Sequence, residues 1–340
     1  MTTRRSYLPL PVTARGTASV APGPVGVAAS SFVDWNHKAE WDADNGVSRI
    51  TVASGSVITS LPKADTHVVF EPSDPDELPL RMLFEPGNGD TLVISMHGAM
   101  DRARFSVPRF EWRRTLNRLD AARLYLSDST LEINSSLEIG WYVGKESQDL
   151  VADYATVVQQ IISAGGFSRV VCVGSSAGGY GALALSRRIP NSLAVAFSPQ
   201  TTIGGYHLAQ RKALAAAAFP GLNSYEEVEK RRGDRVNLRK LYQGTKPVNF
   251  VYFIQNTGDQ FHYEAHYVPF ALANGVDPER GGFAPRHKMY FVPERYENEH
   301  APPSRGYFIS HIQKAHLKFY GRELPLRQLD PEREEELGPR

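Results

Sequence analysis

An apolar run leads directly into a glycine-rich helical segment over residues 169–185, which read RVVCVGSSAGGYGALAL. The first part is typical of a strand covered on both faces, and the second part favours a helix. Between them Gly174, Ser176 and Gly178 form a Gly-x-Ser-x-Gly pattern. A strand that reverses sharply into a helix brings the two backbones together, so the residues two before and two after the turn must be small. The pattern predicts a serine held on a strained turn above a sheet.

Ser176 is the better candidate nucleophile of two adjacent serines. Glycines flank it at both critical positions, whereas Ser175 would have Val173 and Ala177 there, and Val173 is branched at Cβ. Ser176 could instead simply cap the helix that follows. A serine hydroxyl is a poor nucleophile at neutral pH, so it needs a base and a group that orients the base. If Ser176 is a nucleophile, a carboxylate and a histidine must follow it in the chain.

Asp259 and His300 are the candidate acid and base. Asp259 follows the strand-like run NFVYFIQ on a turn that contains Gly258, and His300 lies on the loop after the run KMYFVP. The chain order of serine, acid and histidine, with the acid after a late strand, is that of one known arrangement of catalytic triads. Asp259 could alternatively cap a helix over residues 260–272. With Ser176, these residues form the predicted triad.

The other late histidines have simpler interpretations. His311 and His316 fall inside the C-terminal helical segment, so we interpret them as packing or surface residues. His262 and His266 are four residues apart and could share a metal ion on one helical face. No third ligand is evident beside them, and histidines at this spacing are usually partly exposed helix residues. We therefore predict no metal site and no cofactor.

Attack on a carbonyl develops an oxyanion, which backbone N–H groups can stabilise. The N–H of Ala177 begins the helix after Ser176 and is the first candidate donor. The second should come from the loop after the run TLVISMH, where His97 and Gly98 precede Ala99. We expect Ala99 to donate and Gly98 to allow close approach. His97 is a candidate substrate contact, although it is better explained as an anchor of the loop.

Aromatic residues could line a site for a sugar ring or an apolar acyl chain. Tyr180 and Phe261 are the strongest candidates for substrate binding because each closely follows a catalytic segment. For each aromatic residue, ordinary core packing is the alternative. The full set of candidates comprises Trp112, Trp141, Tyr142, Tyr180, Tyr206 and Phe261.

Strand-like and helical segments alternate along most of the chain. Early β-rich runs (SRITVAS, THVVFEP, LRMLFEP) are expected to form an antiparallel entry to a sheet, and a helix is expected from a Ser147 cap to Gly165 and Gly166. The later runs ARLYLSDS, RVVCVG, LAVAFSP, NFVYFIQ and KMYFVP alternate with helix-compatible sequence. This alternation predicts an α/β fold with a mostly parallel central sheet and helices on both faces.

The chain divides into one main domain with flanking segments. We expect an N-terminal extension over 1–47, the main domain over 48–322 and a polar C-terminal tail over 323–340. A long excursion at about 200–247 predicts a small helical cap inserted in the domain. Its KRRGDR segment could bind phosphate, but the glutamates interleaved with these cations favour a solvated helix face.

Charge and cysteine content exclude several classes of function. The formal net charge is only +1, so neither nucleic-acid binding nor a polybasic membrane surface is favoured. No run approaches the ~18 apolar residues of a membrane span. The single cysteine, Cys172, cannot form an intramolecular disulfide and suits a reducing, cytoplasmic setting. Arg4 and Arg5 resemble a twin-arginine export signal, but prolines interrupt the segment that follows.

From about Thr91 to Phe319 the chain resembles the α/β-hydrolase superfamily of serine hydrolases. Three segments are also similar to hydrolase-fold proteins that accompany bacterial surface-polysaccharide biosynthesis and glycosyl-protein export: HGAMDRARFSVPRFEW, LEIGWYVGKE and NTGDQFHYEAHYVPF. The resemblance implies a serine esterase that cleaves a carboxylic ester through an acyl-enzyme, on a small-molecule or glycan substrate. The alternatives are an acyltransferase that uses the same triad and a non-catalytic hydrolase-fold partner protein.

Overall fold

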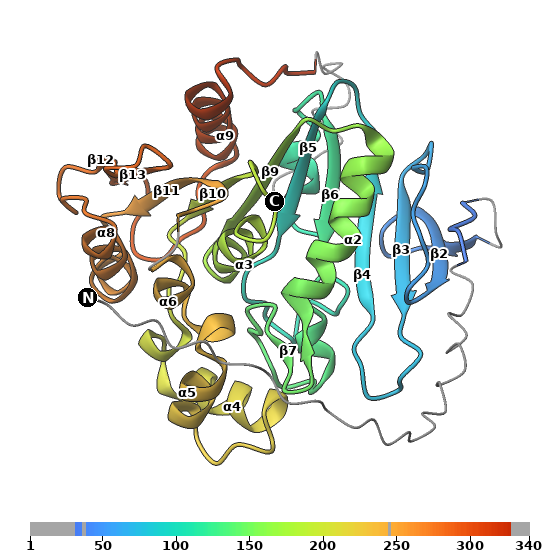
Figure 1. Ribbon diagram of the computed structural model, residues 1–340, viewed down its shortest axis with the longest axis horizontal. Coiled ribbons are helices and arrows are strands. Elements are labelled where there is room, and N and C mark those ends of the chain that lie inside the picture. Colours follow the sequence, from blue (N-terminus) through green and yellow to red (C-terminus); the bar gives the residue numbers. More distant parts are fainter. Residues whose placement is uncertain (1–30, 36–38, 244–245, 328–340) are drawn as a thin grey trace, which may run out of the picture. The chain divides into compact units, whose positions relative to one another are not determined.

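The computed structural model describes residues 31–35, 39–243 and 246–327 (Figure 1). The paired arginines Arg4 and Arg5, most of the predicted N-terminal extension and residues 328–340 of the predicted tail lie outside these ranges. The domain boundaries therefore stay a prediction. Among the described residues, no helix combines the length and the apolar character needed to cross a membrane.

Within the described ranges the main sheet has 11 strands in the order β1-β2-β3-β4-β6-β5-β9-β10-β11-β13-β12, and β7 and β8 form a separate hairpin. The strands are β1 (Glu40–Asp42), β2 (Val47–Ala53), β3 (Thr66–Glu71), β4 (Leu80–Glu85), β5 (Thr91–Met96), β6 (Ala122–Leu126), β7 (Gly144–Lys145), β8 (Gln148–Asp149), β9 (Arg169–Ser175), β10 (Leu193–Phe197), β11 (Phe250–Asn256), β12 (Gly282–Phe283) and β13 (Met289–Glu294).

Helices connect most of the strands from β5 onward. They are α1 (Arg113–Leu116), η1 (Ser129–Glu132), α2 (Leu150–Gly165), α3 (Ala177–Ser186), η2 (Ile203–Gly205), α4 (Leu208–Ala218), α5 (Tyr225–Val236), α6 (Leu238–Tyr242), α7 (Gln260–His262), η3 (Tyr263–Tyr267), α8 (Val268–Ala273) and α9 (Arg305–Tyr320). The helix predicted over residues 260–272 is thus present as the consecutive turns α7, η3 and α8.

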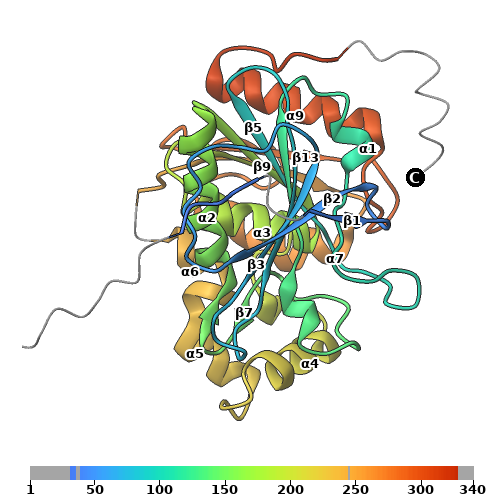
Figure 2. The same cartoon turned by 90° about the vertical axis from the view of Figure 1, so that its right-hand side faces the viewer.

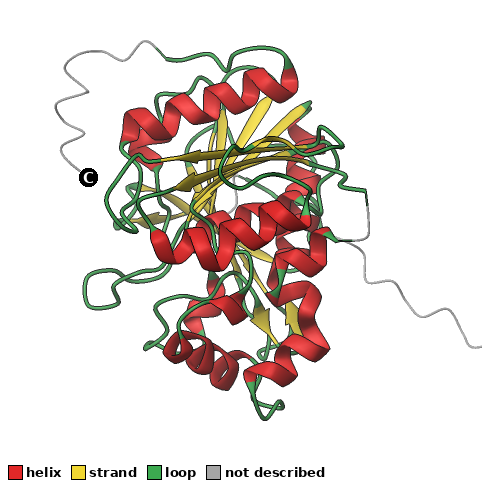
Figure 3. Cartoon of the chain, turned by 90° about the vertical axis from the view of Figure 1, so that its left-hand side faces the viewer, coloured by secondary structure: helices red, strands yellow, loops and turns green. Residues whose placement is uncertain are grey.

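The strands from β6 through β5, β9, β10 and β11 to β13 are all parallel to one another, and β4 and β12 pair antiparallel at the two ends of this block. Alternate residues of β5 face opposite sides: Leu92 belongs to the core cluster that includes buried residues of α2 and α3, whereas Val93 belongs to the cluster that includes Phe308 and Ile312 of α9. Burial of each such side chain contributes about 1.5–3 kcal/mol. Figures 2 and 3 show helices on both sides of the strands. The predicted α/β architecture is confirmed.

One local prediction was wrong in part and a second was wrong. The predicted antiparallel entry is correct for β3 with β4, but β2 and β3 are parallel, because residues 54–65 are long enough to cross back to the starting edge instead of making a tight turn. The N-cap of α2 is Asp149, whose side chain accepts from the N–H of Ala152 at 3.1 Å. Ser147 lies in the turn of the β7–β8 hairpin, so it cannot cap the helix.

The excursion between β10 and β11 is helical, as predicted, and contains α4, α5 and α6 (Figure 1, yellow). It is tied to the segment after β10, because the N–H of Leu238 donates to the carbonyl of Thr201 at 2.9 Å. In the KRRGDR segment, Arg231 pairs with Glu227 at 2.7 Å, and Arg235 donates to the carbonyl of Gln148 at 2.7 Å. These cations make contacts within the protein.

Candidate active site

Ser176 lies on the sharp turn between β9 and α3. Its backbone has φ 55° and ψ −122°, and a positive φ is uncommon for a residue other than glycine. The turn is fixed by a hydrogen bond from the N–H of Ser176 to the carbonyl of Phe197 in β10, at 2.9 Å. Ser176 occupies the N-cap position of α3, but its side chain makes no capping hydrogen bond. Its hydroxyl is bonded to other side chains instead.

Two glycines allow this turn to form. A Cβ at Gly174 would lie 2.3 Å from the carbonyl carbon of Gly178, and a Cβ at Gly178 would lie 2.2 Å from the carbonyl oxygen of Met96. Heavy atoms that are not bonded do not approach so closely. The backbones of β5, β9 and α3 therefore converge beside Ser176, which is the steric reason for the Gly-x-Ser-x-Gly pattern.

The structure brings Asp259 and His300 to Ser176. His300 Nε2 lies 2.8 Å from Ser176 Oγ, and His300 Nδ1 lies 2.5 Å from Asp259 Oδ2. An ionised carboxylate only accepts hydrogen bonds, so Nδ1 of His300 carries the proton and Nε2 is free to accept from the serine hydroxyl. The side chain of His300 is 35% exposed, whereas that of Asp259 is 4% exposed. Solvent and small molecules can therefore reach the base while the acid stays buried.

Asp259 also begins α7. Its Oδ1 accepts from the backbone N–H of His262 at 3.1 Å, a capping hydrogen bond of the ordinary kind. From the sequence, Asp259 was interpreted either as a helix cap or as the partner of a histidine. Both interpretations are compatible, because Oδ1 accepts from the backbone N–H of His262 and Oδ2 accepts from His300. Capping fixes the orientation in which the carboxylate meets His300.

Asn256, the last residue of β11, anchors the loop that carries His300. Its side-chain amide donates to the carbonyls of Glu297 at 3.0 Å and Glu299 at 2.8 Å. Its Oδ1 accepts from the N–H of Gly258 at 3.1 Å. One side chain therefore joins the turn before Asp259 to the loop before His300, which holds the acid and the base in register.

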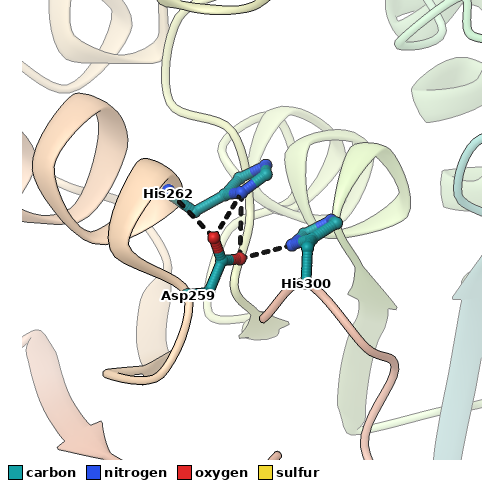
Figure 4. Close-up of side chains that lie close together, drawn as sticks. All are labelled: Asp259, His262 and His300. Atoms are coloured by element: carbon teal, nitrogen blue, oxygen red, sulfur yellow. Dashed lines mark hydrogen bonds and ion pairs between the residues drawn. The ribbon is translucent and has the colours of Figure 1, made fainter. Parts of the chain in front are cut away.

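A second histidine shares the carboxylate of Asp259 (Figure 4). The Nδ1 atom of His262 lies 2.9 Å from Asp259 Oδ2 and 3.1 Å from Oδ1. The rings of His262 and His300 are stacked, with centroids 3.7 Å apart and planes 8° apart. His262 and its neighbour His266 are buried, so the expectation that they are partly exposed helix residues was wrong.

Gln200, three residues after β10, also reaches Ser176. Its Nε2 lies 2.9 Å from Ser176 Oγ and 2.7 Å from His262 Nε2. Its Oε1 accepts from the indole N–H of Trp141 at 3.1 Å. Gln200 and Trp141 are both fully buried, so this amide is a fixed part of the site.

Hydrogen bonds and burial set the charge states in the cluster. Burial opposes ionisation of Asp259, but hydrogen bonds from His262 and His300 outweigh it and hold the pKa of this carboxyl well below its usual range. Burial lowers the pKa of the His262 imidazole and lowers the pKa of His266 to about 3. At neutral pH the site therefore holds one carboxylate facing two imidazoles, of which His262 is neutral.

The two predicted oxyanion donors lie on segments that meet at Ser176. A Cβ built on Gly98 would lie 3.9 Å from the Cβ of Ser176, so the loop after β5 passes directly beside the turn. The N–H groups of Ala177 and Ala99 have no hydrogen-bond partner among the described residues. The N–H of Gly98 is occupied, because it donates to Glu111 Oε2 at 3.0 Å. The free N–H groups are thus those that the sequence favoured as donors.

His97 anchors the loop that follows β5. It is 2% exposed, its Nδ1 lies 2.7 Å from the carbonyl of Gly98, and its Nε2 accepts from the N–H of Asp128 at 2.9 Å. Tyr142 joins the same network, since its hydroxyl accepts from the N–H of His97 at 2.7 Å. With both ring nitrogens engaged, His97 anchors the loop, and the structure gives its interpretation as a substrate contact no support.

The two candidate aromatic contacts differ in exposure. Tyr180 is fully buried, and its hydroxyl donates to the carbonyl of Arg235 at 2.8 Å, so it joins α3 to α5. Phe261 is 37% exposed and stacks on His207 with ring centroids 4.5 Å apart. It precedes His262 directly, so it remains the candidate for contact with a substrate.

Asp259, His262 and His300 are residue types that also bind metals, and their ligand atoms lie within 4.8 Å of one another. Two ligands about 2.0–2.1 Å from a tetrahedral metal are separated by roughly 3.3 Å. The nitrogen atoms of His300 and His262 lie only 2.5 and 2.9 Å from the same oxygen of Asp259. These separations are typical of hydrogen bonds in which a proton lies between the two atoms.

The structure adds residues that sequence reasoning missed, chiefly Gln200, His262 and Asn256. Gln200 follows the strand next to β9, and the carboxyl ends of neighbouring parallel strands meet at one edge of a sheet. Its position after this strand could therefore have indicated that Gln200 lies near Ser176. The pairing of His262 with Asp259 depends on a turn of three residues between them. From the sequence, this spacing of three residues indicated only the start of a helix.

Comparison with known proteins finds similarity to solved structures only. No protein-family model matches the sequence, and no curated protein matches it. A solved structure of the capsule O-acetyltransferase of Neisseria meningitidis serogroup A is similar, with a TM-score of 0.51 and 15% identity over 69% of this chain and 90% of that chain. A histidine-to-alanine variant of the same protein in complex with CoA gives a TM-score of 0.50 and 14% identity over 69% and 91%.

A chain of the glycosylation-associated protein (Gap123) complex from Streptococcus agalactiae is also similar, with a TM-score of 0.52 and 16% identity. The match covers 74% of this chain and 46% of that one. Identities this low establish likeness of fold alone. Together with the parallel sheet, the crossover helices and the turn between β9 and α3, the likeness leads to one conclusion: this chain has the α/β-hydrolase fold.

Proposed function

We propose that this protein is a serine hydrolase that cleaves a carboxylic ester, with Ser176 as nucleophile, His300 as base and Asp259 as the residue that orients the base. The observation that carries the proposal is the pair of hydrogen bonds through His300, at 2.8 Å to Ser176 Oγ and 2.5 Å to Asp259 Oδ2. They supply the nucleophile with a base in the correct tautomer.

The reaction has two steps. Ser176 Oγ attacks the ester carbonyl while its proton passes to His300 Nε2, and the carbonyl π electrons move to the oxygen. The N–H groups of Ala177 and Ala99 stabilise that oxyanion. The intermediate collapses to an acyl-enzyme, and His300 protonates the departing alcohol. Water, deprotonated by His300, then releases the acyl group from Ser176.

The proposed substrate is an ester of a glycan or a small molecule. His300 is partly exposed, which allows an alcohol of some size to leave from its side of the site. Phe261 offers an exposed aromatic ring beside His262, and aromatic rings pack well against apolar groups and sugar faces. A glycan is favoured by the resemblance of three segments of the sequence to hydrolase-fold proteins that accompany bacterial surface-polysaccharide biosynthesis.

Transfer of the acyl group to an alcohol is the second candidate. The fold is similar to that of a capsule O-acetyltransferase, and one structure of that protein is a complex with CoA. The two reactions share the acyl-enzyme and differ only in whether water or an alcohol attacks it. Acylated product formed from added sugar acceptors, with an ester or acetyl-CoA as donor, would favour transfer.

Fluorophosphonate labelling tests the nucleophile, because this reagent reacts with an activated serine. We expect a single label on the peptide that contains Ser176, no label in Ser176→Ala, and hydrolysis of p-nitrophenyl esters that disappears with the same substitution. Comparison of acetyl with longer esters gives the preferred acyl length. Folded protein that is neither labelled nor active on any ester or acceptor would favour the non-catalytic partner role.

A further inference from the structure

Five side chains at the site form a closed circuit of hydrogen bonds. One branch from Ser176 Oγ runs through His300 to Asp259, and the other returns through Gln200 and His262 to the same carboxylate. The bonds in order are Ser176 to His300 at 2.8 Å, His300 to Asp259 at 2.5 Å, Asp259 to His262 at 2.9 Å, His262 to Gln200 at 2.7 Å and Gln200 to Ser176 at 2.9 Å.

Two independent neighbours fix the orientation of the Gln200 amide. The indole N–H of Trp141 can only donate, so the amide atom 3.1 Å from it must be the oxygen. His262 donates from Nδ1 to the carboxylate of Asp259, so its Nε2 is an acceptor and the amide atom 2.7 Å away must be the nitrogen. Both constraints give the same orientation, in which Gln200 presents N–H to Ser176 Oγ.

This orientation also determines where the serine proton points. Because Gln200 donates to Ser176 Oγ, the hydroxyl cannot donate back along that contact. His300 Nε2 is then its acceptor, 2.8 Å away. The donor from Gln200 therefore keeps the serine in the arrangement from which its proton is transferred.

We propose that Gln200 is a further catalytic residue, which donates a hydrogen bond to Ser176 Oγ and stabilises the negative charge that develops on this atom, with Trp141 and His262 acting as positioning residues. The inference rests on the proposed serine-hydrolase function and adds a donor beyond the triad and the backbone oxyanion donors. Gln200 is buried, and its amide is hydrogen-bonded to Trp141 on one side and to His262 on the other. The N–H donor therefore needs no reorganisation during the reaction.

The contribution follows from the bonds that change at Oγ. In the first step the O–H proton moves to His300 Nε2 and an Oγ–C bond forms. When the acyl-enzyme is hydrolysed, the C–Oγ bond breaks, its electron pair returns to Oγ, and His300 returns the proton. Gln200 forms and breaks no covalent bond. A hydrogen bond to oxygen strengthens as negative charge builds on it, so the donor favours both transition states.

Backbone strain nearby is consistent with a site that holds Trp141 in place. Trp141 and Tyr142 have φ values of 51° and 60°, and two successive residues other than glycine with positive φ persist only where their surroundings impose it. The buried Asp128 holds this backbone, since its Oδ2 accepts from the N–H of Tyr142 at 2.9 Å. The indole is thereby aimed at the Gln200 oxygen.

Replacement of the amide by a thioether of similar size tests the role. In Gln200→Met we expect kcat for p-nitrophenyl acetate to fall about 10- to 100-fold with little change in KM, somewhat less than the loss of an oxyanion-hole donor. Fluorophosphonate labelling of Ser176 should slow in parallel. Gln160→Met is the matched control, because the Gln160 side chain accepts from the N–H of Ile58 on another part of the domain, and its kcat should equal that of wild type. An unchanged kcat in folded Gln200→Met would overturn the inference.

A double-mutant cycle with His262→Phe separates catalysis from simple packing. Phenylalanine keeps a ring against His300 but loses the acceptor that orients Gln200. If the two residues act through one contact to Ser176, the loss in the double variant will be close to the larger single loss. Losses in kcat that multiply would overturn the positioning role of His262. If Gln200→Met does not fold, Gln200→Glu serves instead, since it keeps an oxygen for Trp141 and replaces the donor with an acceptor, and it should be at least as impaired.

Failure of the inference can be distinguished from failure of the proposed function. Wild type that is neither labelled nor active refutes the hydrolase itself. Active wild type with fully active Gln200→Met refutes only the role of Gln200.

Discussion

Replacement of Asp259 by asparagine should leave the fold intact while removing most of the activity. Asp259 Oδ1 accepts from the backbone N–H of His262, and Oδ2 faces His300. A backbone N–H cannot become an acceptor, so the oxygen of an asparagine must take the Oδ1 position. Its NH₂ group then faces His300 Nδ1 and forces that atom to be an acceptor, while the oxygen at the Oδ1 position, 3.1 Å from His262 Nδ1, remains the acceptor for His262. The proton moves to Nε2, where it blocks transfer from Ser176.

The magnitude follows from this change of tautomer. A triad whose histidine is held in the wrong tautomer loses kcat by a factor on the order of 10⁴, which is about 5.4 kcal/mol in the activation barrier. The capping hydrogen bond survives, so the cost in stability should be about 1.5–3 kcal/mol, the usual contribution of a hydrogen bond to a charged group. The assay is hydrolysis of p-nitrophenyl acetate, beside urea unfolding of the same sample.

Asp277→Asn is the matched control. The Asp277 carboxylate is exposed and accepts from the N–H of Glu279 at 2.9 Å, a role that an asparagine oxygen can fill, so kcat should not change. Folded Asp259→Asn that keeps kcat within about tenfold of wild type would refute the assignment of Asp259 and the reasoning from its two oxygens.

Three further predictions concern the fold. Gly178→Ala should destabilise the protein by at least about 2 kcal/mol in urea unfolding, because the new Cβ would lie 2.2 Å from the carbonyl oxygen of Met96; equal stability would contradict the close approach. Gly306→Ala should instead raise stability by up to about 1 kcal/mol, because Gly306 lies in α9 with open space around it. The lowered pKa of His266, about 3 because of burial, predicts that stability falls as pH drops below about 6.5, since the unfolded chain binds a proton that the folded one excludes; His266 contributes up to ~1.4 kcal/mol per pH unit to the slope, and His311 and His316, whose pKa values burial lowers to about 4, add to it. Unfolding titrations at pH 7, 6 and 5 should show this slope reduced in His266→Gln, and an identical slope would contradict it.

The parts of the fold that were predicted from sequence depend on local patterns. The apolar run before Gly174 and the helix after Ser176 were correct because strand burial and backbone proximity impose their residue types at fixed spacing. The parallel pairing of β2 with β3 was missed because pairing depends on where a connection of a dozen residues carries the chain, and no local pattern encodes that path.

In the candidate site, too, some residues could be predicted from local sequence patterns and others could not. Ser176, Asp259 and His300 were chosen because each follows a strand, and parallel strands deliver their carboxyl ends to one edge. Gln200 has the same kind of position, but glutamine carries no charge or nucleophile that marks it in a sequence. The doubled use of Asp259 by His262 and His300 could not be predicted, since it depends on the orientation of a single turn between β11 and α7.

The proposed mechanism requires the oxygen of Ser176 to form a covalent bond to the acyl group of the substrate. Rapid mixing with p-nitrophenyl acetate, an acid quench and mass mapping of the peptides test it directly. We expect one acetyl group on the peptide that contains Ser176, absent when Ser176→Ala is treated in the same way. Equal ester turnover by Ser176→Ala, or an acetyl group carried by another residue of the wild type, would refute Ser176 as the nucleophile.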